Sequence, residues 1–139
     1  MIWFKKMSLP EVNAFNSKCM LKYLDIVFTE ITDHSITATM PVCEKTHQPY
    51  GYLHGGASVV LAESIGSVAA NLTVDMDKYA AFGIEVNANH IKAVRSGSVR
   101  GVGRPIHRGV TTQVWGMEIF DDSDNLICVS RLTVAIRKK

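Results

Sequence analysis

The sequence has 139 residues, of which 47% are hydrophobic and 20% are charged, and this size and balance indicate one globular domain over residues 1–139. Its formal net charge of +2 is too small to indicate nucleic-acid binding, and we expect neither a membrane span nor a signal peptide because no apolar run is long enough. The three cysteines are far apart and form no metal-ligand pair, which favours a reducing compartment and predicts a cytoplasmic protein.

The first part of the chain predicts one helix, one strand and one loop. Residues Leu9 to Tyr23 form an amphipathic pattern with Pro10 in the first turn, where proline suits a helix. Residues Ser35 to Val42 alternate between apolar and polar side chains, which predicts a half-buried strand, and Pro41 predicts that this strand is an edge or ends there. Residues 45–53 form a loop that contains proline and glycine.

A long central helix is predicted from Gly55 to about Val74. Many of its residues are small, which lets a helix press close to a sheet or to another helix. Its larger apolar side chains recur at helical spacing and are expected to face the core: Leu61, Ile65, Val68 and Leu72.

The apolar period changes to two after residue 78, which predicts four strands. They are expected at Ala81–Asn89, Gly97–Pro105, Val110–Phe120 and Leu126–Arg137. The turns between them are short, and short turns join antiparallel neighbours. The predicted fold class is therefore α+β, with an antiparallel sheet wrapped around one long helix.

The start of the central helix is suited to binding a carbonyl oxygen. A helix start presents unpaired backbone N–H groups and a partial positive charge, and Gly55 and Gly56 carry no side chain that would block approach. The Gly55 N–H is therefore a candidate oxyanion-hole donor, and Gln48 and His54 stand just before it as further donors.

Glu63 is a single carboxylate among small and apolar residues of the central helix. It is the candidate base or nucleophile, and its neighbours in the sequence predict that it is buried. The alternative is a solvated surface glutamate, which is the common role of a glutamate in the middle of a helix. Ser67 follows one turn later on the same helix face, where it can orient the carboxylate, a water or the substrate.

The distance between these groups predicts a site shared by two chains. Glu63 lies eight residues beyond Gly55, which is roughly 12 Å along one helix. Glu63 is thus too far from a carbonyl held at its own helix start. Two copies of the helix packed antiparallel would bring Glu63 of one subunit to Gly55 of the other, so we expect a homodimer with two equal sites.

Five segments together resemble the hotdog-fold acyl-CoA thioesterases, in particular their PaaI-like branch: Gln48–Ser58, Glu63–Ser67, Gly83–His90, Pro105–His107 and Gln113–Trp115. The resemblance covers nearly the whole chain. It implies a hotdog fold, dimers or dimers of dimers, and hydrolysis of an acyl-CoA thioester to free acid and coenzyme A. It favours an aromatic acyl group, such as 1,4-dihydroxy-2-naphthoyl or hydroxybenzoyl, and menaquinone synthesis as one setting.

The resemblance also implies roles for individual residues. Glu63 matches the family's nucleophile or general base, and the Gly55 N–H with Gln48 matches the site that polarises the carbonyl. His54 matches the residue that orients this site, and Ser67 matches a hydroxyl that positions the reacting group. These roles agree with the interpretation of the helix above.

Coenzyme A contacts are implied on two strand segments and one strand glycine. Gly83 matches a position of close approach. The first segment comprises Asn89, His90, Ile91 and Lys92, and the second comprises Ile106, His107, Arg108, Gly109, Val110 and Thr111. The family often carries arginine just after the glycine that matches Gly109, so Val110 and Thr111 are departures. Tyr50 stands where phenylalanine is common and adds a hydroxyl near the expected acyl pocket.

No cofactor is expected, because coenzyme A is part of the substrate, and the five histidines show no metal-ligand spacing. The expected partners are an acyl-CoA and further copies of the chain, without nucleic acid or membrane. Two alternatives stay open: a hotdog dehydratase or hydratase acting on an acyl thioester, and a non-catalytic module that binds acyl-CoA.

Overall fold

A six-stranded antiparallel sheet is the framework of the computed structural model, which describes residues 1–139. The strands are β1 (Val27–Ile31), β2 (Ile36–Pro41), β3 (Tyr79–His90), β4 (Ser98–Arg108), β5 (Thr112–Phe120) and β6 (Leu126–Lys138). Their order in the sheet is β1-β2-β4-β5-β6-β3. Successive short turns join β4, β5 and β6 as antiparallel neighbours, as the sequence predicted.

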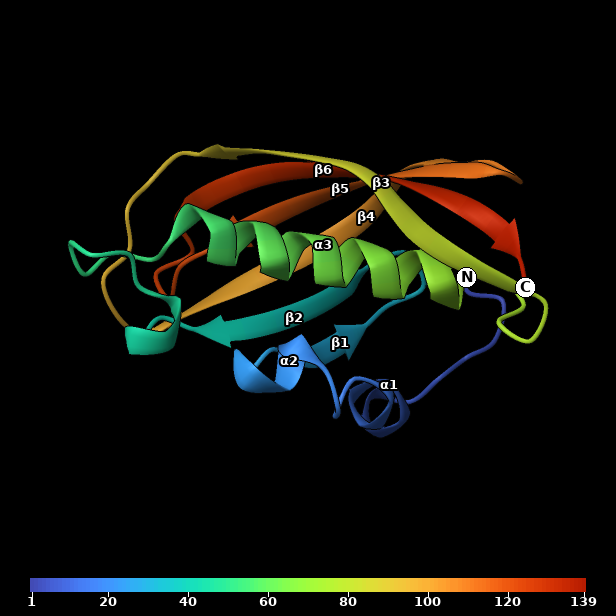
Figure 1. Ribbon diagram of the computed structural model, residues 1–139, viewed down its shortest axis with the longest axis horizontal. Helices are drawn as coiled ribbons and strands as arrows, with labels where there is room; N and C mark the ends of the chain where they lie inside the picture. Colours follow the sequence, from blue (N-terminus) through green and yellow to red (C-terminus); the bar gives the residue numbers. More distant parts are fainter.

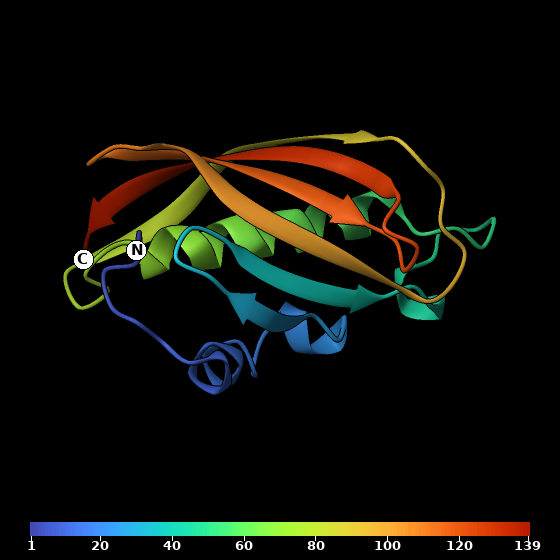
Figure 2. The same cartoon turned by 180° about the vertical axis from the view of Figure 1, so that it is seen from behind.

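Helix α3 (Gly55–Leu72) crosses the concave face of this sheet (Figures 1 and 2). Its sheet-facing side is buried and consists of Ser58, Leu61, Ala62, Ile65, Gly66, Ala69, Ala70 and Leu72. Gly66 permits close packing, because a Cβ there would lie 2.7 Å from a Leu132 methyl group on β6. The prediction of a long helix with small residues against the sheet is confirmed, but Val68 lies only half-buried, beside the sheet-facing side.

The N-terminal helical region is broken, so the prediction of one helix over Leu9–Tyr23 is wrong. The chain forms α1 (Leu9–Phe15) and α2 (Met20–Tyr23) instead. Asn16 ends α1, and its side-chain amide donates to the Val12 carbonyl at 2.8 Å. This local side-chain bond occupies a carbonyl of the last turn and competes with continuation of the helix.

Strand β1 was not predicted from the sequence. It has five residues and buries only Phe28, so no clear alternation marks it. It pairs with β2 at one edge of the sheet, and β2 therefore lies between β1 and β4. Of the two predictions made from Pro41, an edge strand or a strand end, the second is confirmed, because Pro41 is the last residue of β2.

Strand β3 forms the other edge of the sheet and positions the site. It pairs with β6 on one side only. Its Phe82 and Ile84 side chains are 58% and 62% exposed. Helix α3 lies alongside it, and the Ala81 N–H donates to the Asn71 side chain at 2.9 Å. The free edge is thus long, carries two exposed apolar side chains and lies close to the central helix. A further short element, η1 (Glu44–Thr46), precedes the loop that leads into α3.

Candidate active site

The Gly55 N–H has no hydrogen-bond partner within the chain. It opens α3, and the next three N–H groups are all satisfied: Gly56 donates to His54 Nδ1 at 2.8 Å, and Ala57 and Ser58 donate to the His54 carbonyl. One donor at the positive end of the helix is therefore left free. It can bind and polarise a carbonyl oxygen.

His54 and Gln48, in the loop that leads to this N–H, each keep a free donor. His54 caps the helix, and because its Nδ1 accepts from Gly56, the proton of the neutral ring lies on Nε2. The Gln48 side-chain oxygen accepts from the Tyr50 N–H, which leaves the Gln48 amide NH2 free to donate. Of these donors, the Gln48 amide lies on the same cavity as the Gly55 N–H and can act with it on a developing oxyanion.

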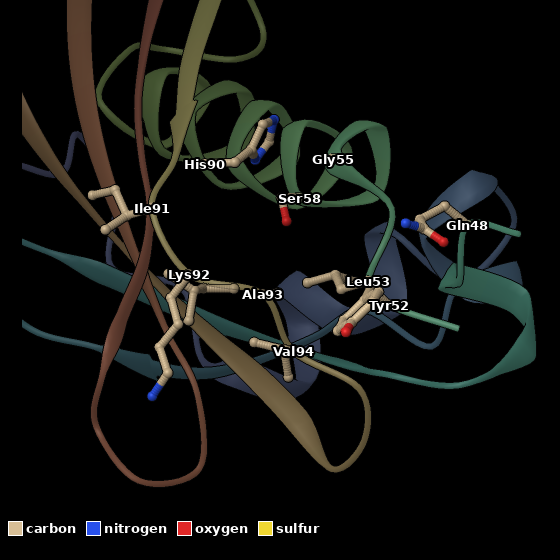
Figure 3. Close-up of a pocket in the computed structure, with 11 residues that line it drawn as sticks. Gln48, Tyr52, Leu53, Gly55, Ser58, His90, Ile91, Lys92, Ala93 and Val94 are labelled. Carbon is tan, nitrogen blue, oxygen red and sulfur yellow. The ribbon is translucent and has the colours of Figure 1, made fainter. Parts of the chain in front are cut away.

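A cavity of about 370 Å³ opens beside the helix start (Figure 3). Gln48 and Gly55 line it together with His90, Ile91 and Lys92 of the segment implied to contact coenzyme A. The His90 ring packs against Gly55, where a Cβ would lie 2.8 Å from Nε2. In Figure 3 the Lys92 ammonium group points out of the cavity, and its nitrogen lies 3.6 Å from an Asp121 carboxylate oxygen.

Asp121 is the anionic partner at this end of the sheet. The Asn125 backbone N–H holds the pKa of the Asp121 carboxyl below its usual value, and the Asn125 side chain, the Ser123 N–H and the Lys92 charge act in the same direction. Asp121 therefore stays ionised and attracts Lys92 toward the β5–β6 turn.

Glu63 faces the β3 edge rather than the sheet. Its carboxylate lies over Gly83, where a Cβ would be 2.8 Å from Glu63 Oε1. The predicted close approach at Gly83 therefore accommodates the carboxylate within the chain. The expectation of burial is wrong for the single chain, because the helix face that carries Glu63 is half-buried and turned away from the core. No residue of the chain forms a hydrogen bond or an ion pair with this carboxylate.

Ser67 lies one turn after Glu63 and lines a second cavity of about 190 Å³. The walls of this cavity are mostly apolar, and they come from α3, α1 and the segments beside them: Met7, Val12, Phe15, Val68, Leu72 and Met76, with the polar Asn16 and Asn71. A compact and mostly apolar cavity that is lined by the Ser67 residue suits an apolar group more than a charged nucleotide.

The profile of the thioesterase superfamily matches residues 50–128 of the chain. The chain belongs to this superfamily. It is similar to 1,4-dihydroxy-2-naphthoyl-CoA hydrolase of Escherichia coli strain K12, with 52% identity over 136 residues that cover 98% of this chain and 99% of that protein. It is also similar to the proofreading thioesterase EntH of Cronobacter sakazakii, with 46% identity over 136 residues and 98% coverage of both chains.

A crystal structure of a thioesterase mutant from Pseudomonas aeruginosa superposes on this chain with a TM-score of 0.98, at 45% sequence identity and with 100% of both chains covered. The predicted α+β hotdog fold and the resemblance to this family are confirmed, and the protein is a thioester hydrolase. No helix of the thioesterase is long and apolar enough to cross a membrane.

The thioesterase does not bring all the predicted site residues together in one chain. Gln48, Gly55, His90, Ile91 and Lys92 share one cavity, whereas Glu63 and Ser67 lie further along α3. The two implied coenzyme A segments lie at opposite ends of the sheet. Across the strands, His90 aligns with Cys128, Ile119 and Gly101, whereas Gly83 aligns with Val134, Gln113 and Arg108.

The second implied segment is anchored to the chain itself. Arg108 donates to the Ile2 carbonyl at 2.8 Å, and the Gly109 N–H donates to the Thr112 carbonyl at 2.9 Å. Gly109 also lies close to His107, whose Nε2 would be 2.8 Å from a Cβ there. Val110 is 91% exposed and Ile106 is 64% exposed, and Thr111 is exposed beside Val110.

Four further residues lie at or near the site. Asn89 and Ile106 line a cavity of about 490 Å³ on the sheet, away from Gly55. Tyr50 is 82% exposed in the loop before α3 and lines neither the cavity beside Gly55 nor the cavity beside Ser67. Ser58 lines the cavity at the helix start and was missed from the sequence, where a buried helical serine is indistinguishable from a small packing residue.

Proposed function

We propose that the thioesterase hydrolyses an acyl-CoA with an aromatic acyl group to the free acid and coenzyme A, at a site shared by two chains. The observation that carries this proposal is the unpartnered Gly55 N–H at the rim of a cavity, together with the unpartnered Glu63 carboxylate further along the helix. The naphthoyl-CoA hydrolase at 52% identity supports the choice of acyl group.

The free edge of β3 supports pairing with a second copy. It is 12 residues long and exposes Phe82 and Ile84. A long edge with unpaired backbone groups and exposed apolar side chains is a template for another strand unless it is covered. Antiparallel pairing of β3 with the same strand of a partner would cover both edges and place two copies of α3 side by side.

The register of this pairing follows from the contacts along β3. Gly55 lies against His90, and Glu63 lies against Gly83. A two-fold axis between Val86 and Asn87 would place Gly83 of one chain opposite the partner's His90. The partner's Glu63 would then approach Gly55, which is the arrangement that the reaction requires.

In the proposed reaction, the thioester carbonyl oxygen accepts hydrogen bonds from the Gly55 N–H and the Gln48 amide. The partner's Glu63 either attacks the carbonyl carbon or removes a proton from a water that attacks it. The tetrahedral intermediate collapses, the carbon–sulfur bond breaks, and the sulfur leaves with the electron pair. Because a thiol has a pKa of about 8.5, the thiolate is a fair leaving group and needs no strong general acid. No cofactor takes part.

The two arms of the thioester match two cavities of different polarity. The apolar cavity beside Ser67 belongs to the chain that supplies Glu63, and we place the acyl group there. The cavity beside Gly55 carries polar groups and leads to Lys92 and Arg95, and we place the sulfur arm of coenzyme A there. We keep the cytoplasm as the proposed location, since all three cysteines are free.

A panel of acyl-CoA substrates tests the proposed activity. Benzoyl-CoA, 4-hydroxybenzoyl-CoA and 1,4-dihydroxy-2-naphthoyl-CoA are compared with palmitoyl-CoA by release of free thiol. We expect kcat/KM for the best aromatic substrate to exceed that for palmitoyl-CoA by at least about tenfold, because the acyl cavity is compact. Absence of thiol release from every substrate would refute hydrolysis, and preference for palmitoyl-CoA would refute the acyl assignment.

The shared site is tested by mixing two inactive chains. Glu63→Gln and Gly55→Pro chains with different tags are co-expressed, and the mixed dimer is isolated through both tags. One of its two sites then combines an intact Gly55 with an intact Glu63, so we expect about half of the wild-type activity per dimer. If one chain alone forms each site, the mixed dimer stays as inactive as either parent.

A further inference from the structure

Ser58 carries a hydroxyl group with no hydrogen-bond partner in the chain, and its oxygen stays in contact with the cavity rather than being sealed in the core. The residue is 2% exposed and belongs to the sheet-facing side of α3. A helical serine commonly bonds the carbonyl four residues earlier. Here that carbonyl, of His54, already accepts the N–H groups of Ala57 and Ser58. The Ser58 hydroxyl therefore retains both its donor and its acceptor capacity.

This hydroxyl points into the cavity beside the helix start. Ser58 lines that cavity, and Figure 3 shows its oxygen directed from α3 toward Leu53 and Ala93. A ligand that fills the cavity displaces water from this hydroxyl group, and the loss is compensated when the ligand supplies a hydrogen bond in its place. The hydroxyl group therefore adds a polar contact to the part of the wall that Leu53 and Ala93 form.

The position of Ser58 indicates which part of a ligand it contacts. It follows Gly55 by three residues, a rise of roughly 4.5 Å along the helix. The carbonyl of a thioester at Gly55 fixes the sulfur nearby, and the first amide of the pantetheine arm begins two methylene groups beyond that sulfur. An amide has one donor and one acceptor, and a hydroxyl group can pair with either.

Two cations next to this cavity suit the phosphate end of the same arm. Arg95 stacks on Tyr52, with the guanidinium carbon 4.1 Å from the ring centroid, and donates to the Tyr52 hydroxyl at 2.6 Å. Lys92 also lines the cavity, and its ammonium group points outward, where it pairs with Asp121. Polar groups inside and cations outside follow the order of amides and phosphates in coenzyme A.

We propose that the Ser58 hydroxyl hydrogen-bonds the amide of the pantetheine arm nearest the sulfur, and so makes Ser58 a specificity-determining residue for coenzyme A thioesters. This inference rests on the proposed function above, which places the sulfur arm in the cavity beside Gly55. Ser58 contacts the thiol leaving group, and its hydrogen bond favours a thiol that carries an amide over one that carries a plain alkyl chain.

The test uses two small thioesters of benzoic acid and the substitution Ser58→Ala. The N-acetylcysteamine thioester retains the first amide of the arm, whereas the S-pentyl thioester replaces it with methylene groups. We expect Ser58→Ala to lower kcat/KM for the first substrate about fivefold, and to change that for the second by less than about twofold. Alanine favours a helix and removes no internal bond, so the variant is expected to fold.

Ser64→Ala is the matched control, because Ser64 is half-buried on the same helix and lines neither cavity. Its kcat/KM for both thioesters is expected to equal that of the wild type. Equal losses for both thioesters in Ser58→Ala, or no loss for either, would overturn the assignment.

Calorimetric titration with coenzyme A gives a readout that does not depend on hydrolysis. A dissociation constant about fivefold weaker in Ser58→Ala supports the proposed contact, even if the wild type hydrolyses no thioester. An unchanged dissociation constant contradicts the contact.

Discussion

Glu63→Gln is expected to lower kcat by about 10³-fold, because glutamine has nearly the shape of glutamate but cannot act as a base or as a carboxylate nucleophile. Steady-state release of thiol from the best aromatic acyl-CoA measures this effect. The melting temperature should stay close to that of the wild type, since no group in the chain bonds the Glu63 carboxylate.

Glu44→Gln is the matched control for this substitution. Glu44 is an exposed carboxylate in η1 whose side chain forms no hydrogen bond or ion pair, and its replacement should leave kcat unchanged. Retention of wild-type activity by Glu63→Gln would remove Glu63 from the proposed reaction and return it to the role of a solvated helix residue.

Oxygen labelling separates the two routes open to Glu63. A single turnover in ¹⁸O-labelled water is followed by mass analysis of the protein and of the acid. If Glu63 attacks the carbonyl, an anhydride forms, and its hydrolysis at the Glu63 carbonyl leaves label in the protein. If Glu63 activates water, all the incorporated label appears in the released acid. Label in Glu63 after one turnover therefore excludes simple water activation.

Gly55→Pro is expected to lower kcat by about 10²-fold, because proline removes one N–H donor from the oxyanion site. The helix should survive, since proline is well tolerated at the first helical position. The preceding residue also suits proline: His54 has φ of −67° and ψ of 131°, which is extended backbone. Circular dichroism checks that the helix is retained, and thiol release measures the rate.

Gly55→Ala separates the loss of the N–H from steric effects. Alanine keeps the N–H but introduces a Cβ that would lie 2.8 Å from His90 Nε2, so the imidazole must shift. Proline introduces a Cβ at the same place. A Gly55→Ala enzyme that keeps most of its activity assigns the loss in Gly55→Pro to the donor. Equal losses in both would show that displacement of His90 is responsible, and would contradict the oxyanion role of Gly55.

The pattern of apolar and polar side chains along the sequence predicted helices and strands best where it repeats over a long stretch. The central helix and the four later strands were all found near their predicted positions. Two failures have a common cause. Strand β1 buries one side chain, and the break after α1 depends on the Asn16 side chain bonding the Val12 carbonyl. A short element with little periodicity is determined by such contacts, which a hydrophobic pattern does not register.

The candidate site shows the same division. The sequence by itself determined that the Gly55 N–H and the Glu63 carboxylate belong to one helix. It also determined that they are too far apart for both to act on one carbonyl group within one chain, because the rise along a helix depends only on the number of residues. Only the tertiary structure decided that the Gly55 N–H has no partner, that Glu63 lies half-buried against Gly83 at a free sheet edge, and that the Ser58 hydroxyl faces a cavity. These facts depend on how α3 is rotated and placed against β3, and that placement results from packing between residues far apart in the chain.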